Sequence, residues 1–211
     1  MTSPKPIYQD DNILIIFKPQ GIETASETTE DTLEKKVGHP ACHRLDVNTE
    51  GLVIFAKNKQ TAASMRTAFE NGLVDKTYLA LCFGKLHKSP LTLSGYLLKD
   101  AKNSTVKITR EKVPGSVAIK TNVKFVKTVK DFSLIEVKPF TGRTHQVRAH
   151  LASIGLSIVG DSKYGDFKLN RAYGIKKQYL CASSLAFNFP AESNLHYLNA
   201  KSFSVTPTFL K

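Results

Sequence analysis

The chain has 211 residues, of which 41% are hydrophobic and 23% are charged, an ordinary composition for a globular protein. This length is enough for one domain with a sizeable hydrophobic core. The 30 Lys and Arg residues outnumber the 18 Asp and Glu residues, which gives a formal net charge of +12. Such an excess favours a polyanionic partner, because neutralised phosphates release counterions, although a basic surface can also serve solubility alone.

Cysteine usage and hydropathy narrow the class of protein further. Cys42, Cys82 and Cys181 are far apart, odd in number and without metal-ligand spacing. They predict a reducing compartment and no disulfide framework. No stretch approaches the apolar length of a membrane span, and the first residues lack a signal-peptide pattern. We therefore expect a cytoplasmic protein that does not enter the membrane.

The first part of the chain predicts a tail, a strand and a loop. Residues 1–6 contain two prolines and no periodicity, which is typical of a loose terminus. Residues 13–17 form a short apolar run between polar residues and predict a buried strand. The polar residues 23–32 predict a loop, and residues 33–37 a short turn.

A polar loop from His43 to Gly51 leads into the apolar run 52–56, which predicts a buried strand. Asp46 follows Arg44 by two residues and precedes Gly51, a residue that permits a tight backbone path. Loop residues held on a rigid strand are a common location for chemistry. From these residues alone, Asp46 could equally cap a turn, and Arg44 could be a solvated surface charge.

The middle of the chain predicts a helix and further strands. Asn58 can cap a helix whose apolar residues recur on one face and which Asn71-Gly72 closes. Residues 78–83 predict a strand. Residues 85–115 show little periodicity and many lysines, so we expect loops and short strands there. Contact with the phosphates of a polyanionic partner and a solvated charged edge are about equally favoured.

The alternation in residues 117–125 predicts a strand, which a connection at residues 127–131 joins to another at 132–137. Val147, Leu151 and Ile154 then align on a helix that ends at Gly155, with Arg148 beside this apolar stripe. After Gly165 the pattern fades until a strand-like run at residues 179–182.

Strands dominate and do not alternate one for one with helices, and no second domain boundary is visible. The fold class is therefore α+β around a mostly antiparallel sheet, in a single domain over residues 1–211.

Several of these segments together resemble the RluA-like family of RNA pseudouridine synthases. The segments that carry the resemblance, in the family's order, are Tyr8–Gly21 with its Lys18-Pro19-x-Gly21 turn, the His43-Arg44-Leu45-Asp46-x-x-Thr49-x-Gly51 loop, Lys76-x-Tyr78, and Lys138–Gly165. One departure is Glu50, where many members have a small residue. The resemblance implies a pseudouridine synthase catalytic fold, a bent mixed sheet with flanking helices and a central cleft. Some members carry an RNA-binding domain before the core; here the opening strand begins near Ile7 and leaves no room for one.

The resemblance also implies a reaction in which the N1–C1′ bond of a uridine breaks and the uracil rejoins through C5. Asp46 would be the catalytic carboxylate, and Tyr78 would stack on the uracil and assist proton removal from C5. A buried carboxylate stays ionised more easily beside a cation. Arg148 is the expected partner of Asp46, and Arg143 is the competing candidate.

RNA contacts are expected from further residues of the same segments. Arg44 resembles the family arginine that fills the space of the extruded uridine. The remaining expected RNA contacts are His43, Arg143, His145 and Lys18. The two histidines could instead be hydrogen-bonding scaffold, Lys18 could form a turn in the cleft wall, and Asp161 is expected to bond nearby backbone in a structural turn.

The expected partner is ribosomal or transfer RNA, with no metal, no nucleotide cofactor and a monomeric state. Two rival classes stay open. One is a non-catalytic RNA-binding module that retains the fold. The other is a metal-dependent hydrolase that uses Asp46, His43 and His145, although no second carboxylate lies near these positions in the sequence.

Overall fold

The computed structural model describes residues 5–211, which divide into two compact units. Unit 1 comprises residues 1–76 and 181–211, and unit 2 comprises residues 77–180. The sequence alone shows no boundary between these two units. The reason is that the chain leaves unit 1 within a strand, β4 (Val74–Cys82), and returns at the start of another, β9 (Leu180–Phe187), so no linker marks either crossing.

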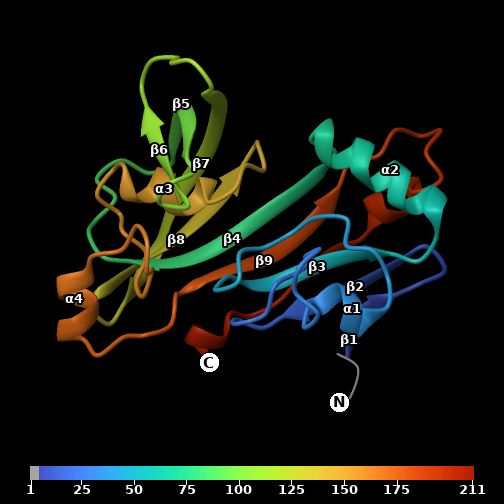
Figure 1. The fold of residues 1–211 in the computed structure, drawn as a ribbon, viewed down its shortest axis with the longest axis horizontal. Helices are drawn as coiled ribbons and strands as arrows, with labels where there is room; N and C mark the ends of the chain where they lie inside the picture. The colour runs from blue at the N-terminus through green and yellow to red at the C-terminus, as the bar shows by residue number, and fades with distance from the viewer. Residues whose placement is uncertain (1–4) are drawn as a thin grey trace. The chain divides into compact units, whose positions relative to one another are not determined.

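Unit 1 is built on strands in the order β1-β2-β3-β9, with β10 paired to β9 (Figure 1). The bounds are β1 Pro6–Gln9, β2 Ile13–Lys18, β3 Glu50–Ala56 and β10 Ser202–Ser204. All pairs are antiparallel except β3 with β9, which is parallel. The predicted strands at residues 13–17 and 52–56 are confirmed.

The helices of unit 1 are short apart from one. Their bounds are α1 Leu33–Val37, α2 Lys59–Glu70, and the 3₁₀ turns η1 His196–Ala200 and η2 Thr208–Leu210. The predicted cap of α2 is confirmed, because Asn58 Oδ1 accepts from Thr61 N at 2.8 Å. Residues 33–37, expected as a turn, are helical, since Thr32 Oγ1 accepts from Lys35 N and the αL residue Gly38 closes the helix.

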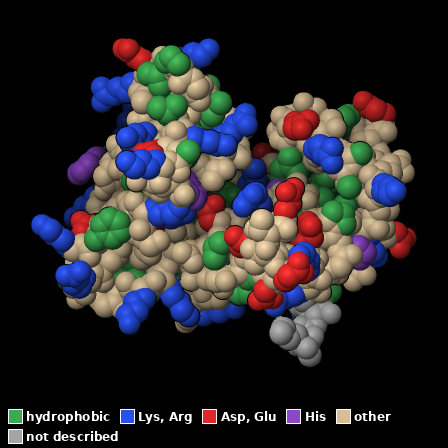
Figure 2. Space-filling model, in the orientation of Figure 1, with side chains coloured by type: hydrophobic (Ala, Val, Ile, Leu, Met, Phe, Trp, Pro, Cys, Tyr) green, Lys and Arg blue, Asp and Glu red, His purple; other side chains and the backbone are tan. Residues whose placement is uncertain are grey.

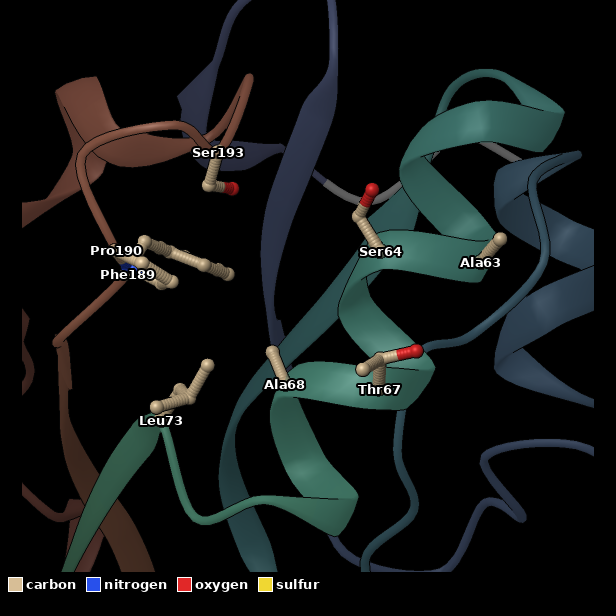
Figure 3. A pocket seen from close by; sticks show the side chains of 8 residues that line it. All are labelled: Ala63, Ser64, Thr67, Ala68, Leu73, Phe189, Pro190 and Ser193. Atoms are coloured by element: carbon tan, nitrogen blue, oxygen red, sulfur yellow. The ribbon is translucent and has the colours of Figure 1, made fainter.

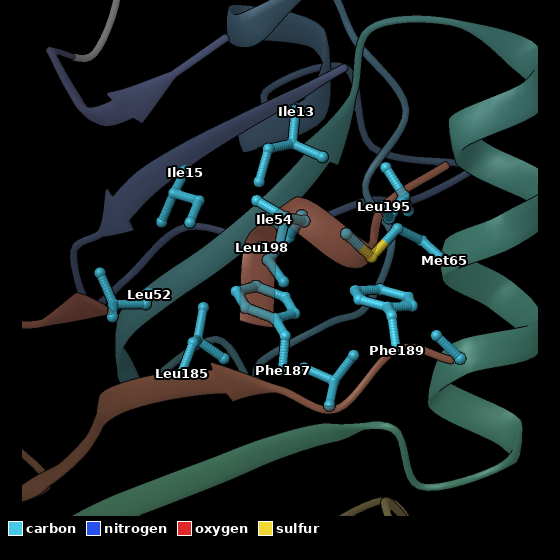
Figure 4. Packing of buried hydrophobic residues seen from close by; sticks show 12 residues of the cluster. Ile13, Ile15, Leu52, Ile54, Met65, Leu185, Phe187, Phe189, Leu195 and Leu198 are labelled. Carbon is cyan, nitrogen blue, oxygen red and sulfur yellow. The ribbon is translucent and has the colours of Figure 1, made fainter. Parts of the chain in front are cut away.

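The core of unit 1 lies between its sheet, α2 and the C-terminal segment. Figure 4 shows Met65 of α2 directed towards the same cluster as Ile54 of β3 and Phe187 of β9. Every residue of β3 is buried. The strand that follows the Asp46 loop is therefore a rigid support for it.

Unit 2 is an antiparallel sheet in the order β4-β8-β7-β5-β6. The bounds are β5 Leu91–Asp100, β6 Thr105–Thr109, β7 Val117–Val129, β8 Phe132–Pro139, α3 Gln146–Ala152 and α4 Phe167–Ala172. Val147 and Leu151 of α3 pack on one side of this sheet, with Val123, Ile135 and Val137. The predicted helix before Gly155 is confirmed.

Unit 2 differs from expectation in two strand lengths and one helix. Residues 85–115 contain a ten-residue strand, β5, rather than only short strands, because its apolar residues face the sheet's core. Strand β7 runs to Val129 through a bulge, so the connection to β8 is only Lys130-Asp131. Helix α4 was missed; Asp166 caps it. The α+β class with a mixed, mostly antiparallel sheet is confirmed.

Candidate active site

The backbone around Asp46 is held by hydrogen bonds from the preceding loop. Thr24 Oγ1 accepts from Leu45 N and donates to Leu45 O, both at 3.1 Å. Gly21 N donates to Val47 O at 2.9 Å, and Thr49 N donates to Asp46 O at 3.0 Å. The residues on both sides of Asp46 are thus fixed, so its half-buried side chain projects from an ordered turn.

Lys18 is a second element that orders this loop. Its side chain is completely buried, and Nζ donates to the carbonyl oxygens of Pro19, Ile22 and Val47 at 2.9–3.1 Å. Burial lowers the pKa of Lys18 to about 8, while the carboxylates of Asp46 and Glu50 oppose this shift. This corrects the expectation that Lys18 contacts RNA: its three N–H donors are all used on protein carbonyls. The alternative, a turn that positions the wall, is the one the geometry supports.

Gly51 and Glu50 fix the end of the loop. Gly51 has a φ of +129°, and a Cβ atom there would lie 2.4 Å from the carbonyl oxygen of Ala182. This confirms that the position requires glycine. Glu50, the departure from the family pattern, is buried, and its carboxylate accepts from Thr208 N and Thr208 Oγ1 at 2.7 and 2.6 Å.

His43 has a structural position. Its Nε2 accepts from Ile54 N at 3.1 Å, and its ring packs against Phe69 with centroids 4.8 Å apart. Burial, with the nearby charge of Lys76, lowers the pKa of His43 to about 3, so the ring is neutral. The scaffold alternative accounts for these contacts. They do not support the expected contact between His43 and an RNA phosphate, because a neutral ring whose Nε2 accepts from backbone offers no cation.

Arg148 in unit 2 forms a buried bidentate ion pair that the sequence analysis did not foresee. Its Nε lies 2.7 Å from Asp161 Oδ2, and its Nη2 lies 2.8 Å from Asp161 Oδ1. The side chains are 5% and 0% exposed. Burial alone would raise the pKa of Asp161, but the hydrogen bond and charge of Arg148 outweigh it and hold this pKa below its usual range.

Asp161 also forms the expected turn, since its Oδ1 accepts from Lys163 N and Tyr164 N at 2.8 and 3.0 Å. The pairing of Asp161 with Arg148, thirteen residues earlier, had no signal in the spacing. Sequence reasoning also missed Tyr164. Its ring lies 5.2 Å from the guanidinium of Arg148, and its hydroxyl accepts from Val106 N and bonds His145 Nδ1.

The other predicted residues lie in different settings. Arg44 of unit 1 and Arg143 of unit 2 are exposed, as a contact with RNA requires. Tyr78 lies on β4 opposite Val137 and is half-buried against the core of unit 2. The roles predicted for these residues, and the pairing of Asp46 with Arg148 or Arg143, stay predictions.

A groove of about 360 Å³ in unit 1 lies between α2 and the segment after β9 (Figure 3). Its lining residues are Ala63, Ser64, Thr67, Ala68, Leu73, Phe189, Pro190 and Ser193. None of the predicted site residues lines it. Its small side chains include no titratable group, so it offers no chemistry for the reaction considered above.

Two kinds of feature are absent from residues 5–211. No group of three or more His, Cys, Asp and Glu side chains lies close enough together to bind a metal ion in this part of the chain. Over the same residues, no helix has the length and apolar character needed to span a membrane.

Comparison with known proteins places these features in a family. The model of the RNA pseudouridylate synthase family matches residues 12–153. A ribosomal large subunit pseudouridine synthase C of Rickettsia bellii is 37% identical over 180 residues, which are 80% of this chain and 59% of that protein. An uncharacterised RNA pseudouridine synthase of Mycoplasma genitalium is 32% identical over 97% of this chain and 71% of its own.

Among solved structures, human RNA pseudouridylate synthase domain containing 1 has a TM-score of 0.76 and 26% identity, covering 96% of this chain and 89% of its own. The chain spans only 59% of the length of the Rickettsia bellii relative. The family match itself covers Asp46, Tyr78 and Arg148 within residues 12–153. The chain therefore belongs to the RNA pseudouridylate synthase family.

Proposed function

We propose that this protein is an RNA pseudouridine synthase that isomerises specific uridines through Asp46 after the target base has been extruded. The observation that carries the proposal is the family match, which spans all three predicted catalytic residues. The ordered loop around Asp46 supports it as well. A carboxylate on a preorganised turn needs little rearrangement to meet the sugar carbon of a flipped nucleotide.

In the proposed reaction, the N1–C1′ bond breaks while Asp46 acts at C1′, and the uracil turns and rejoins through C5. The proton on C5 then leaves to solvent, and N1 takes one up, so no oxidant, metal or nucleotide is consumed. Tyr78 stacks on the uracil and assists removal of the C5 proton. Arg148 pairs with Asp46, and Arg44 fills the space that the uridine vacates.

We propose ribosomal RNA as the first substrate to test, because relatives carry the name ribosomal large subunit pseudouridine synthase. Transfer RNA is the alternative substrate. We further propose that the protein acts in the cytoplasm as a monomer. Exposed Arg143, and His145 beside it, would contact phosphates of the bound RNA.

The test is release of tritium from RNA labelled at uracil C5, in the absence of added metal and nucleotide. Asp46→Asn preserves size and hydrogen-bonding capacity but removes the anion, so we expect RNA to bind and tritium release to stop. Asp11→Asn is the matched control, since Asp11 is exposed in unit 1. Release by Asp46→Asn near the wild-type rate would refute the role of Asp46. Absence of release by the wild type on all cellular RNA would favour a non-catalytic RNA-binding module.

A further inference from the structure

The positive charge of the chain belongs to one unit. Unit 2 carries 19 Lys and Arg residues against 6 Asp and Glu, a formal charge of +13, whereas unit 1 carries 11 against 12, a charge of −1. Figure 2 shows Lys and Arg side chains spread over the surface. A polyanion that binds by charge will therefore find its contacts on unit 2.

The sheet of unit 2 has one side covered and one side carrying lysines. Helix α3 packs on the side that Val123 and Val137 face. Side chains alternate along a strand, so Lys124 and Lys138, the next residues along β7 and β8, face the opposite side. Lys120 lies four residues before Lys124 and shares its side. A bulge in β7 follows Phe125, and beyond it Lys127 pairs with Leu134. The side chain of Lys127 is therefore on the same side of the sheet as that of Lys124.

These four exposed lysines, Lys120, Lys124, Lys127 and Lys138, are here called the basic face. Lys120 and Lys124 are roughly 13 Å apart along β7. Lys138 lies opposite Asn122, midway between them, and is about 7–8 Å from each on the diagonal. This arrangement places ammonium groups at intervals that successive phosphates of one strand can reach.

Few acidic groups compete for these lysines. Glu136 lies opposite Lys124 and is 3.8 Å from Lys138 Nζ, a long contact in which the lysine side chain stays 56% exposed. Such an exposed pair contributes little and is easily exchanged for a phosphate. Beside the lysines, Asn122 Nδ2 donates to Thr92 Oγ1 at 3.2 Å, which places neutral hydrogen-bonding groups on the same side.

The basic face continues into the loop before α3. Phe140 N donates to Lys120 O at 3.0 Å, and Lys120 Nζ lies 5.2 Å from the centre of the Phe140 ring. That ring is 60% exposed, a large value for an aromatic side chain. Exposed Arg143 follows three residues later. A ring beside cations is the combination that binds single-stranded nucleic acid, because bases stack on the ring while cations contact the phosphates.

We propose that the basic face binds phosphates of the substrate RNA outside the modified nucleotide, with Phe140 as a stacking surface at its edge. This inference rests on the proposed function, because it takes the partner to be the RNA that is modified. Ammonium groups are compact point charges without the paired geometry of guanidinium, so this contact positions the RNA without selecting its sequence. Specificity for one uridine then arises elsewhere in the protein.

The test compares two triple variants with the same change in charge. Lys120→Gln/Lys124→Gln/Lys138→Gln removes three lysines of the basic face. Lys168→Gln/Lys176→Gln/Lys177→Gln removes three exposed lysines of the same unit that lie outside it. Affinity for a substrate RNA fragment is measured by filter binding from about 50 to 200 mM salt, a range over which phosphate contacts weaken strongly.

For the basic-face variant, we expect the slope of log K against log salt to fall by about 2–3, at roughly 0.7–0.9 for each lost phosphate contact. The control variant should keep a slope close to that of the wild type. Equal slopes and affinities for the two triples would overturn the proposal. So would loss of binding to phosphatidylserine vesicles with RNA binding intact, because the face would then belong to a membrane surface.

Failure of the basic-face proposal can be distinguished from failure of the proposed function. Binding is measured without turnover, and tritium release is measured on the wild type alone. Tritium release together with identical binding by both triples would refute the basic face and keep the enzyme. Selective weakening by the basic-face triple, without tritium release from the wild type, would keep the RNA surface and refute the enzyme. A Phe140→Leu variant should weaken RNA binding while leaving the salt slope unchanged, since it removes stacking and no charge.

Discussion

Among residues 5–211, each unit buries one long cation, and the two cations are held in opposite ways. Lys18 of unit 1 is bound by three backbone carbonyls. Arg148 of unit 2 is bound by both oxygens of Asp161. Carbonyl groups satisfy the donors of a cation but are neutral, whereas a carboxylate makes a charge-assisted, bidentate contact with it. The Lys18 ammonium interacts electrostatically with the carboxylates of Asp46 and Glu50, and Arg148 is fixed in orientation by Asp161.

The two ways of holding a buried cation have different consequences for pKa and for rigidity. Lys18 is held by neutral carbonyls, and burial lowers its pKa to about 8. A bidentate pair instead holds the pKa of Asp161 below its usual range and is rigid, because two parallel hydrogen bonds fix the guanidinium plane. We expect unit 2 to depend on its pair for stability, and the Asp46 loop to depend on Lys18 for electrostatics.

The largest effect is expected from Asp161→Ala. Removing one partner leaves Arg148 buried without its carboxylate and leaves two backbone N–H groups without an acceptor. The free energy of unfolding should therefore fall by about 3–5 kcal/mol. Denaturant titration measures this. Asp166→Ala is the control; it removes the cap of α4 and should cost about 1 kcal/mol. Asp161→Asn should fall between the two if Asp161→Ala does not fold, and a midpoint equal to wild type for Asp161→Asn would contradict the account.

Lys18→Met should cost less stability, about 2–3 kcal/mol, because three carbonyls lose their donor but a charge no longer has to be buried. Its effect on Asp46 is the sharper readout. Without the cation, the Asp46 carboxylate loses a nearby positive charge, so the rate of tritium release at saturating RNA should fall while RNA affinity changes little. Lys59→Met, at the exposed start of α2, is the control. A wild-type rate of tritium release by folded Lys18→Met would show that the lysine acts only as a brace.

The effect that is smallest at neutral pH appears only in acid. The pKa of His43 in unit 1 is lowered to about 3, and that of His150 in unit 2 to about 4, both by burial. Between these values and 6.5 the unfolded chain binds more protons than the folded one, so stability falls as the pH is lowered through this window. Each histidine contributes at most about 1.4 kcal/mol per pH unit.

Unfolding midpoints between pH 7 and about pH 4 check this contribution. His43→Gln and His150→Gln should each flatten the decline, and the exposed His87→Gln should not. Equal slopes in all three variants would mean that carboxylates, rather than the buried histidines, set the acid response of both units.

The sequence predicted the elements whose signals are local. The Asn58 cap and the buried strand after the Asp46 loop follow from short-range chemistry, and the structure confirms them. The expectation for Lys18 failed because an exposed and a buried lysine look alike in a sequence. Its burial depends on a carbonyl of Val47, twenty-nine residues later, which no local pattern encodes.

The same reason explains what was missed in unit 2. The alternation of β5 is interrupted by Gly95 and by partly exposed residues, so its length becomes visible only when β7 pairs along it. The resemblance implied Asp46 as the partner of Arg148, and the turn at Asp161 indicated only backbone bonding in the sequence. Long-range pairs of this kind are set by the packed fold, not by spacing.

The parallel pairing of β3 with β9 has a consequence for the order in which the protein can fold. Glu50 pairs with Cys181 and Gly51 with Ala182, so the strand behind Asp46 acquires this neighbour only from the last part of the chain. Unit 2 is one continuous segment and can fold while the ribosome is still making residues 181–211. The sheet of unit 1 cannot be completed until β9 has been made. The pairing of β3 with β9 then closes a long loop, which is slow. The half that carries most of the positive charge is thus complete before the half that carries Asp46, and β9, made only after the strands of unit 2, completes the strand support of the Asp46 loop.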